Sequence, residues 1–152
     1  MKRGLAICVL VLAGCGARSG PNNTPDPGAL PLARGSTVVE RVTECDHSAN
    51  AFCGVELVVV NPQTQSSGAL VAKERYRLRK SGWSIGQGDI PAERSAASPD
   101  GKLRVTYATA SGDLLGIDLG WITRSRPLAL ALARAMFGRQ PAMSIMLETG
   151  PA

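Results

Sequence analysis

A nearly continuous run of apolar, mostly β-branched residues from Val55 to Val60 identifies the centre of this fold. Only Glu56 interrupts the run, and such a segment is typical of a central strand that is covered on more than one side. Asn61 and Pro62 then end the strand with a turn. We therefore expect a sheet that is built around this segment.

Weaker patterns predict the rest of the sheet. Further strands are expected at residues 37–42, 82–85, 103–109 and, as a last strand that closes the sheet, 144–148. Residues 92–98 lack a regular pattern, so we expect an irregular segment there. The next residues, Ser98-Pro99-Asp100-Gly101, suit a type I turn. Residues 114–122 do not decide between helix and strand.

Two segments predict helices. The first covers residues 67–81, with Ser66 or Ser67 as its N-cap and Gly82 directly after its end. The second covers residues 127–137, begins after a serine cap and is also followed by a glycine. Combined with the strands, these helices predict an α+β fold, in which a mostly antiparallel sheet carries two helices packed on one face.

The N-terminus has the features of an export signal. Lys2 and Arg3 supply a basic start, an apolar run of about ten residues follows, and small residues precede Cys15. A membrane-spanning helix needs about twenty apolar residues. We therefore expect this signal to be removed rather than kept as a membrane span.

The end of this signal, Leu12-Ala13-Gly14-Cys15, resembles the lipobox of bacterial lipoproteins. In that family the cysteine sulfur receives a diacylglyceryl group, the signal is cut off, and acyl chains such as palmitate hold the protein on a membrane. The resemblance implies a signal peptide at residues 1–14 and a lipid anchor at Cys15. It also implies a location on the extracytoplasmic face of the cell membrane or cell envelope. Stable anchoring needs two or more acyl chains, since a single chain is marginal.

The remaining chain divides into a tether and one domain. Residues 16–35 are dense in Gly, Pro and Asn and show no apolar periodicity, so residues 15–35 are expected to be the lipidated cysteine and a disordered tether. Residues 36–152 are long enough for a single α+β domain with its own core. Loss of the signal lowers the net charge from +5 to +3. This charge favours a mild attraction to anionic headgroups and does not indicate a nucleic-acid partner.

The segment from Cys45 to Cys53 contains the only histidine of the chain, His47, and the sequence allows two interpretations of it. A metal site could use both cysteines, His47 and Asp46. A disulfide would instead close a nine-residue loop between the first two strands. An oxidising compartment favours the disulfide, and structural zinc usually binds more closely spaced cysteine pairs. We therefore expect a Cys45–Cys53 disulfide and no metal.

Three groups of charged residues could carry chemistry. Glu74 points toward the apolar side of the first helix, where it could be a carboxyl of raised pKa in a pocket or could extend its head to water or an arginine. Asp113 and Asp118 could act as an acid–base pair, but loop solvation explains them better. The cationic face of the same helix is either solvated or in contact with headgroups or an acidic partner; it comprises Lys73, Arg77, Arg79 and Lys80.

The second helix is apolar on two sides. Leu128, Leu132 and Met136 form one side and are expected in the core, whereas Leu130 and Phe137 lie on the opposite side. A surface helix needs only one apolar side. Leu130 and Phe137 are therefore either buried by the terminal strand and a loop or form a partner surface.

No nucleophile motif, glycine-rich phosphate loop or metal-ligand cluster appears in the sequence. In size and layout the domain also resembles uncharacterised small α+β lipoproteins of high-GC bacteria. We expect a membrane-anchored, non-enzymatic binding or assembly module that needs no cofactor and binds an envelope protein. The alternative is a carrier of a small ligand or lipid, with a pocket between helices and sheet.

Overall fold

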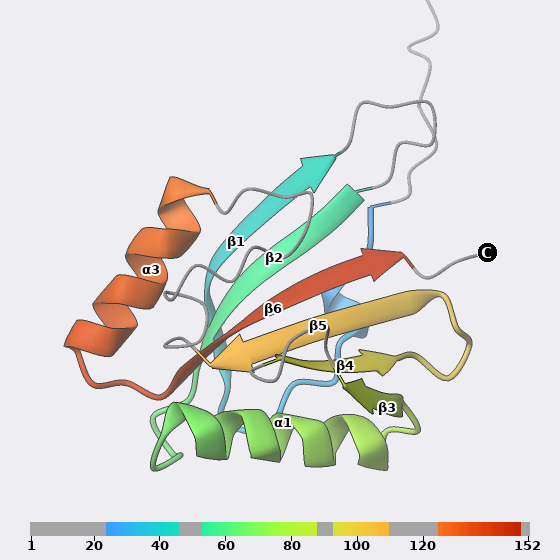
Figure 1. Cartoon of the computed structure of the whole chain (residues 1–152), viewed down its shortest axis with the longest axis horizontal. Coiled ribbons are helices and arrows are strands. Elements are labelled where there is room, and N and C mark those ends of the chain that lie inside the picture. Colours follow the sequence, from blue (N-terminus) through green and yellow to red (C-terminus); the bar gives the residue numbers. More distant parts are fainter. Residues whose placement is uncertain (1–23, 46–52, 88–92, 110–124, 150–152) are drawn as a thin grey trace, which may run out of the picture.

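The computed structural model describes residues 24–45, 53–87, 93–109 and 125–149 (Figure 1). In chain order these residues form a short 3-10 helix (Pro27–Ala29), β1 (Thr37–Cys45), β2 (Cys53–Val60), α1 (Ser67–Lys80), β3 (Ser84–Gln87), β4 (Glu93–Ala97), β5 (Leu103–Thr109), α3 (Arg126–Phe137) and β6 (Ala142–Thr149).

The six strands form one sheet in the order β1-β2-β6-β5-β4-β3, and every neighbouring pair is antiparallel. This confirms the predicted α+β class and the antiparallel sheet. The C-terminal strand β6 lies in the middle of the sheet, between β2 and β5, rather than at an edge. Helix α1 crosses one face of the sheet and joins β2 to the far edge strand β3.

Helices α1 and α3 cover opposite faces of this sheet. Alternate residues of a strand point to opposite faces. Val55 and Val59 of β2 belong to the apolar cluster beneath α1, whereas Val58 and Val60 belong to the cluster beneath α3. The prediction that both helices pack on one face was therefore wrong. Because β2 is apolar on both of its faces, the sheet needs a cover on each side.

Strand β4 occupies residues for which the sequence predicts an irregular segment, so that prediction is wrong. Its sequence, Glu-Arg-Ser-Ala-Ala, has little intrinsic preference for a strand. It nevertheless pairs with β3 on one side and β5 on the other, from Glu93 opposite Ala108 to Ala97 opposite Arg104. Tertiary pairing thus determines this strand.

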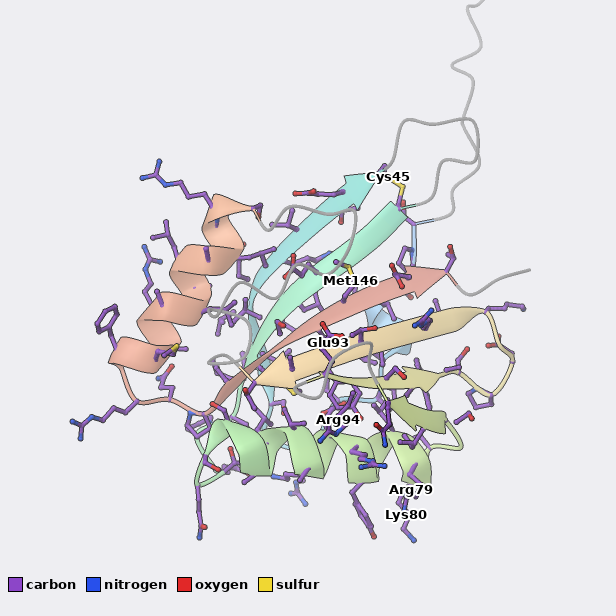
Figure 2. All side chains as sticks on the ribbon, viewed as in Figure 1. Cys45, Arg79, Lys80, Glu93, Arg94 and Met146 are labelled. Atoms are coloured by element: carbon purple, nitrogen blue, oxygen red, sulfur yellow. A yellow bond between two sulfur atoms is a disulfide. The ribbon has the colours of Figure 1, made fainter. Side chains whose placement is uncertain are left out.

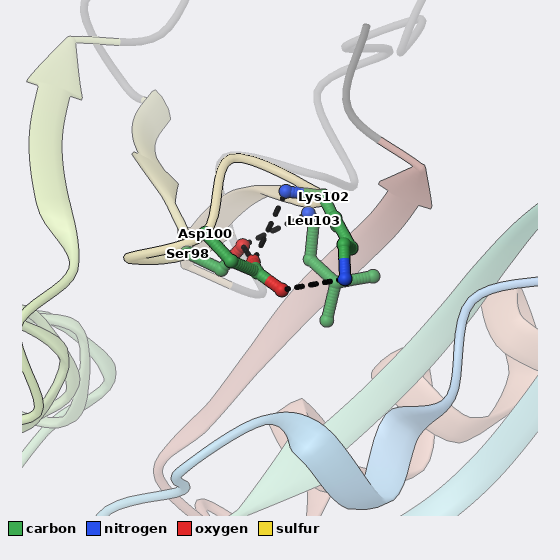
Figure 3. Close-up of polar contacts among 4 residues, drawn as sticks. All are labelled: Ser98, Asp100, Lys102 and Leu103. Carbon is green, nitrogen blue, oxygen red and sulfur yellow. Dashed lines mark hydrogen bonds and ion pairs between the residues drawn. The ribbon is translucent and has the colours of Figure 1, made fainter. Parts of the chain in front are cut away.

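The turn predicted between β4 and β5 is confirmed. The backbone N–H of Gly101 donates to the carbonyl of Ser98 at 2.9 Å, and Gly101 has a φ of 71°, which suits glycine. The Asp100 carboxylate accepts hydrogen bonds from the Ser98 hydroxyl at 2.6 Å and from the Lys102 backbone at 3.1 Å (Figure 3). The first of these bonds does most to lower the pKa of Asp100. The side chains themselves therefore fix the hairpin.

The segment before β1 is part of the folded domain, so the prediction of a disordered tether as far as residue 35 was wrong for residues 24–35. Leu30 and Ala33 are buried, and Leu30 belongs to the cluster beneath α1. The side-chain amide of Asn61 donates to the carbonyl of Arg34 and to the hydroxyl of Ser36, both at 3.1 Å. Buried polar groups far along the chain thus hold a segment whose own composition suggests disorder.

Candidate functional site

Helix α3 is positioned by one narrow apolar stripe. Leu128, Leu132 and Ala135 are buried and lie on the same side of the helix, at the spacing of successive turns. Ser125 is the N-cap residue, as predicted, although its side chain makes no capping hydrogen bond. At the other end, Gly138 ends the helix by donating its backbone N–H to the carbonyl of Arg134 at 2.9 Å.

The opposite side of α3 is exposed. Leu130 is 45% exposed and Phe137 is 90% exposed, so the terminal strand does not bury these two residues. Met136 is 43% exposed, so its predicted place in the core was wrong. Ala135 takes that place, because it continues the buried stripe whereas Met136 falls on the flank of the last turn. Leu130, Met136 and Phe137 are called the α3 apolar surface below.

This apolar surface is surrounded by positive charge. Arg126 and Arg134 are exposed on α3, and Arg139 is exposed just beyond it. Between Ser125 and Pro141 the sequence contains no acidic residue. The electrostatic potential around this surface is therefore positive.

Two hollows adjoin α3. The first, of about 160 Å³, lies between α3 and the edge strand β1 and is called the β1–α3 groove; it is lined by Val39, Glu40, Val60, Ala131, Arg134, Ala135 and Gln140. The second, of about 260 Å³, lies beyond the end of α3 and is lined by Gln65, Ser66, Ser67, Met136, Arg139, Gln140 and Pro141. Gln140 lines both hollows, so they adjoin at the C-terminal end of α3.

Strand β1 presents an unusual local geometry to the groove. The register of β1 on β2 shifts between Val38 and Glu40, which marks a β-bulge at Val39. A regular strand would point Val39 and Glu40 to opposite faces, yet both line the same groove. Bulges often re-aim side chains in this way near binding sites.

The disulfide predicted at the end of β1 is present. Cys45 and Cys53 are bonded and lie directly opposite each other in the ladder between β1 and β2, with a Cα–Cα distance of 4.0 Å. The cross-link therefore joins the edge strand to its neighbour at one end. Asp46 and His47, which the metal interpretation would need, lie outside the described residues.

Glu74 is a buried carboxyl that belongs to the core of the domain. Its side chain is completely buried on α1, and Oε2 accepts a hydrogen bond from the backbone N–H of Ala33 at 2.8 Å. Burial raises the pKa of Glu74 to about 7, while the bond from Ala33 and the nearby charge of Arg77 oppose this rise. Neither alternative describes this residue in full: burial raises its pKa, but the carboxyl holds the N-terminal segment and neither lines a described hollow nor reaches water.

Tyr107 is the second buried polar side chain beneath α1. Its hydroxyl has no hydrogen-bond partner among the described residues. Burial raises the pKa of Tyr107 to about 12, with Glu74 adding to the rise and Arg75 and Arg94 opposing it. The phenol therefore stays protonated at physiological pH, and we assign no proton-transfer role to it.

The cationic face of α1 is exposed at its C-terminal end. Arg79 and Lys80 extend away from the sheet (Figure 2), and the Lys80 ammonium lies 5.6 Å from the centre of the Tyr76 ring. Lys73 instead donates a hydrogen bond to the carbonyl of Arg34 at 3.1 Å, so it helps to hold the N-terminal segment.

Other predicted sites fall outside the described part of the chain, namely Cys15, Asp113 and Asp118. Within the described residues no group of three potential metal ligands occurs. None of the helices in these ranges is long and apolar enough to cross a membrane. The carrier hypothesis expects a pocket between helices and sheet; the β1–α3 groove lies in such a place, but its volume of about 160 Å³ is below the range of about 300–1,000 Å³ that is usual for ligand pockets.

The chain matches no protein-family model, no curated protein and no solved structure.

Proposed function

We propose that this protein is an extracytoplasmic lipoprotein, anchored by lipid on Cys15, whose domain binds a protein partner through the α3 apolar surface without catalysing a reaction. The observation that carries the proposal is Phe137, which is 90% exposed on a helix whose other side is fully buried. Exposed apolar side chains that cluster and are rimmed by polar residues are typical of interaction surfaces. The disulfide supports a location in an oxidising compartment.

The composition of the surface favours a protein partner. Burial of a large apolar side chain such as Phe137 contributes about 1.5–3 kcal/mol. Arginines next to aromatic residues are also enriched where binding energy is concentrated, and Arg134 and Arg139 flank this one. An envelope protein with an apolar patch and acidic residues fits both features.

Capture of partners from detergent-solubilised membranes tests the proposal. The wild-type chain should recover a discrete protein in near-stoichiometric amount. Leu130→Ser and Phe137→Ser should lose this protein while unfolding at the same denaturant concentration as wild type. Tyr76→Ser is the matched control, because Tyr76 is 63% exposed but lies on α1. A partner that all three variants retain would contradict a binding role for α3.

The anchor needs a separate experiment. Cells that express the chain are grown with labelled palmitate, and the label should appear in the wild-type protein and disappear in Cys15→Ser. Cys8→Ser is the control, since Cys8 lies within the expected signal. Equal labelling of Cys15→Ser and wild type would remove the lipid anchor from the proposal.

A further inference from the structure

We propose that the β1–α3 groove receives an extended, acidic peptide segment of the partner, which adds to the sheet as a new strand beside β1. The inference rests on the proposed function in one respect, namely that the domain binds a protein. It specifies the mode of binding and the chemistry of the bound segment.

The backbone of β1 lies at one edge of the sheet. Among the described strands, β1 has a neighbour on one side only. The Cα atoms of Cys45 and Cys53 lie 4.0 Å apart, a short separation that is typical of a non-hydrogen-bonded pair in an antiparallel ladder. In such a pair the backbone groups point away from the partner strand. Because this pattern repeats every second residue, Thr43 and Arg41 also direct their backbone groups to the open edge.

One of these outward backbone amides already donates a hydrogen bond to a side chain of the same strand. The backbone N–H of Arg41 donates to Oε1 of Glu40 at 3.1 Å. This confirms that the Arg41 amide faces away from β2. The carboxylate occupies the place where the carbonyl of an added strand would accept the same hydrogen bond. An incoming segment can displace it, because Glu40 is only partly buried.

The β1–α3 groove can receive a side chain of an added strand. Every second side chain of such a strand would point to the face of the sheet that α3 covers. The β1–α3 groove lies on this face, and its volume of about 160 Å³ suits one apolar side chain of moderate size. The bulge at Val39 provides an apolar wall for this side chain. The sheet edge therefore supplies hydrogen bonds and the groove supplies selectivity.

Positive charge lies along the α3 wall of the groove. Arg134 lines the groove, and Arg139 follows the end of α3. Glu40 is the one acidic residue among those that line the groove, whereas the segment from Ser125 to Pro141, which forms its α3 wall, contains arginines and no acidic residue. Charge complementarity therefore selects an acidic segment.

Selection of peptides tests the inference. The probe is a library of random ten-residue peptides displayed on phage, selected against the full-length chain carrying Cys15→Ser in detergent. Selected peptides should alternate apolar residues with Asp or Glu. Their binding should slow hydrogen exchange at the backbone amides of Arg41 and Thr43.

Matched variants separate the edge from the groove. Thr43→Pro removes an outward amide and should weaken binding by about fivefold or more, whereas Thr43→Val keeps the amide and should bind like wild type. Arg134→Glu should weaken binding by about tenfold, and Arg126→Glu, the same change outside the groove, by less than about twofold.

Each other outcome overturns the inference. Failure to select any peptide would do so, as would peptides whose binding ignores both Thr43→Pro and Arg134→Glu. The result is separable from the proposed function. If Phe137→Ser abolishes partner capture while the β1 variants retain it, the α3 apolar surface stands and the added strand does not.

Discussion

The stability of the fold depends on whether the carboxyl of Glu74 is protonated or charged. It is completely buried, and it accepts a hydrogen bond from Ala33, which lies in the segment before β1. Arg77 is the nearby cation that favours its charged form, and the phenol of Tyr107 shares the same buried layer. Burial outweighs these contacts and raises the pKa of Glu74 from 4.5 to about 7.

This pKa predicts a stability that falls as the pH rises. The folded protein keeps the proton up to about pH 7, whereas the unfolded chain releases it near pH 4.5. The free energy of unfolding should therefore decrease across this window and level off above it, by about 3 kcal/mol in total. Glu74→Gln, which cannot ionise, should flatten the dependence.

Urea unfolding between about pH 5 and about pH 8 measures this change in the window where Glu74 titrates. Glu44→Gln is the matched control, because it makes the same chemical change on β1 rather than in the core. If Glu74→Gln and wild type lose the same free energy of unfolding across the window, Glu74 is not the group responsible.

The Cys45–Cys53 disulfide makes a second prediction at this scale. The bond joins cysteines separated by eight positions, so replacing both by alanine should lower the free energy of unfolding by about 2.5 kcal/mol. Reductant should lower the stability of wild type by a similar amount and leave the double variant unchanged. Mass spectrometry of non-reduced peptides checks the linkage, and two free thiols or bound zinc would revive the metal interpretation.

Local signals at single residues were predictable because they act over a few positions. Ser66 caps α1 through a hydrogen bond from the backbone of Ala69, and Gly82 follows the helix with a φ of 82°. The helical period also placed Glu74 toward the core. Its partner Ala33, however, lies 41 positions away, and no local pattern in the sequence indicates that pairing.

At the scale of elements, the strongest sequence patterns predict strands and helices correctly. They do not predict how these elements are arranged in the fold. Residues 103–109 form β5 as predicted, because alternation is a clear signal. β4 was missed because pairing rather than propensity determines it. The apolar run in β2 already implied a cover on more than one side, and α3 on the second face supplies it.

Alanine substitutions on the two sides of helix α3 should have different effects on the free energy of unfolding. Leu128 and Leu132 are buried, so their replacement by alanine should cost about 2–5 kcal/mol of stability. Leu130→Ala and Phe137→Ala remove exposed groups and should change the free energy of unfolding by less than about 0.5 kcal/mol. Denaturant unfolding of the four variants checks this contrast. Strong destabilisation by Phe137→Ala would show that its ring is covered in the folded protein, which contradicts the exposed surface.

At the scale of the whole molecule, the domain is larger than its composition suggests. The sequence placed its first residue at 36, because the preceding segment is rich in glycine and proline. The structure places residues 24–35 against the layer between α1 and the sheet, where Leu30 fills the core. Composition shows how much apolar surface a segment can bury by itself. It does not show the hydrogen bonds that the segment makes with Glu74 and Asn61.

The N-terminal boundary of the domain can be tested by truncation. A chain that begins at Thr37 loses the buried Leu30, and it leaves the carboxyl of Glu74 and the amide of Asn61 without their hydrogen-bond partners. Loss of a buried leucine together with these bonds should lower the free energy of unfolding by about 3–5 kcal/mol relative to a chain that begins at Thr24. Limited proteolysis of the longer chain should also leave a resistant fragment whose N-terminus lies near Thr24 rather than near Thr37. Equal stability of the two chains, together with early cleavage between residues 24 and 36, would mean that this segment is a tether after all.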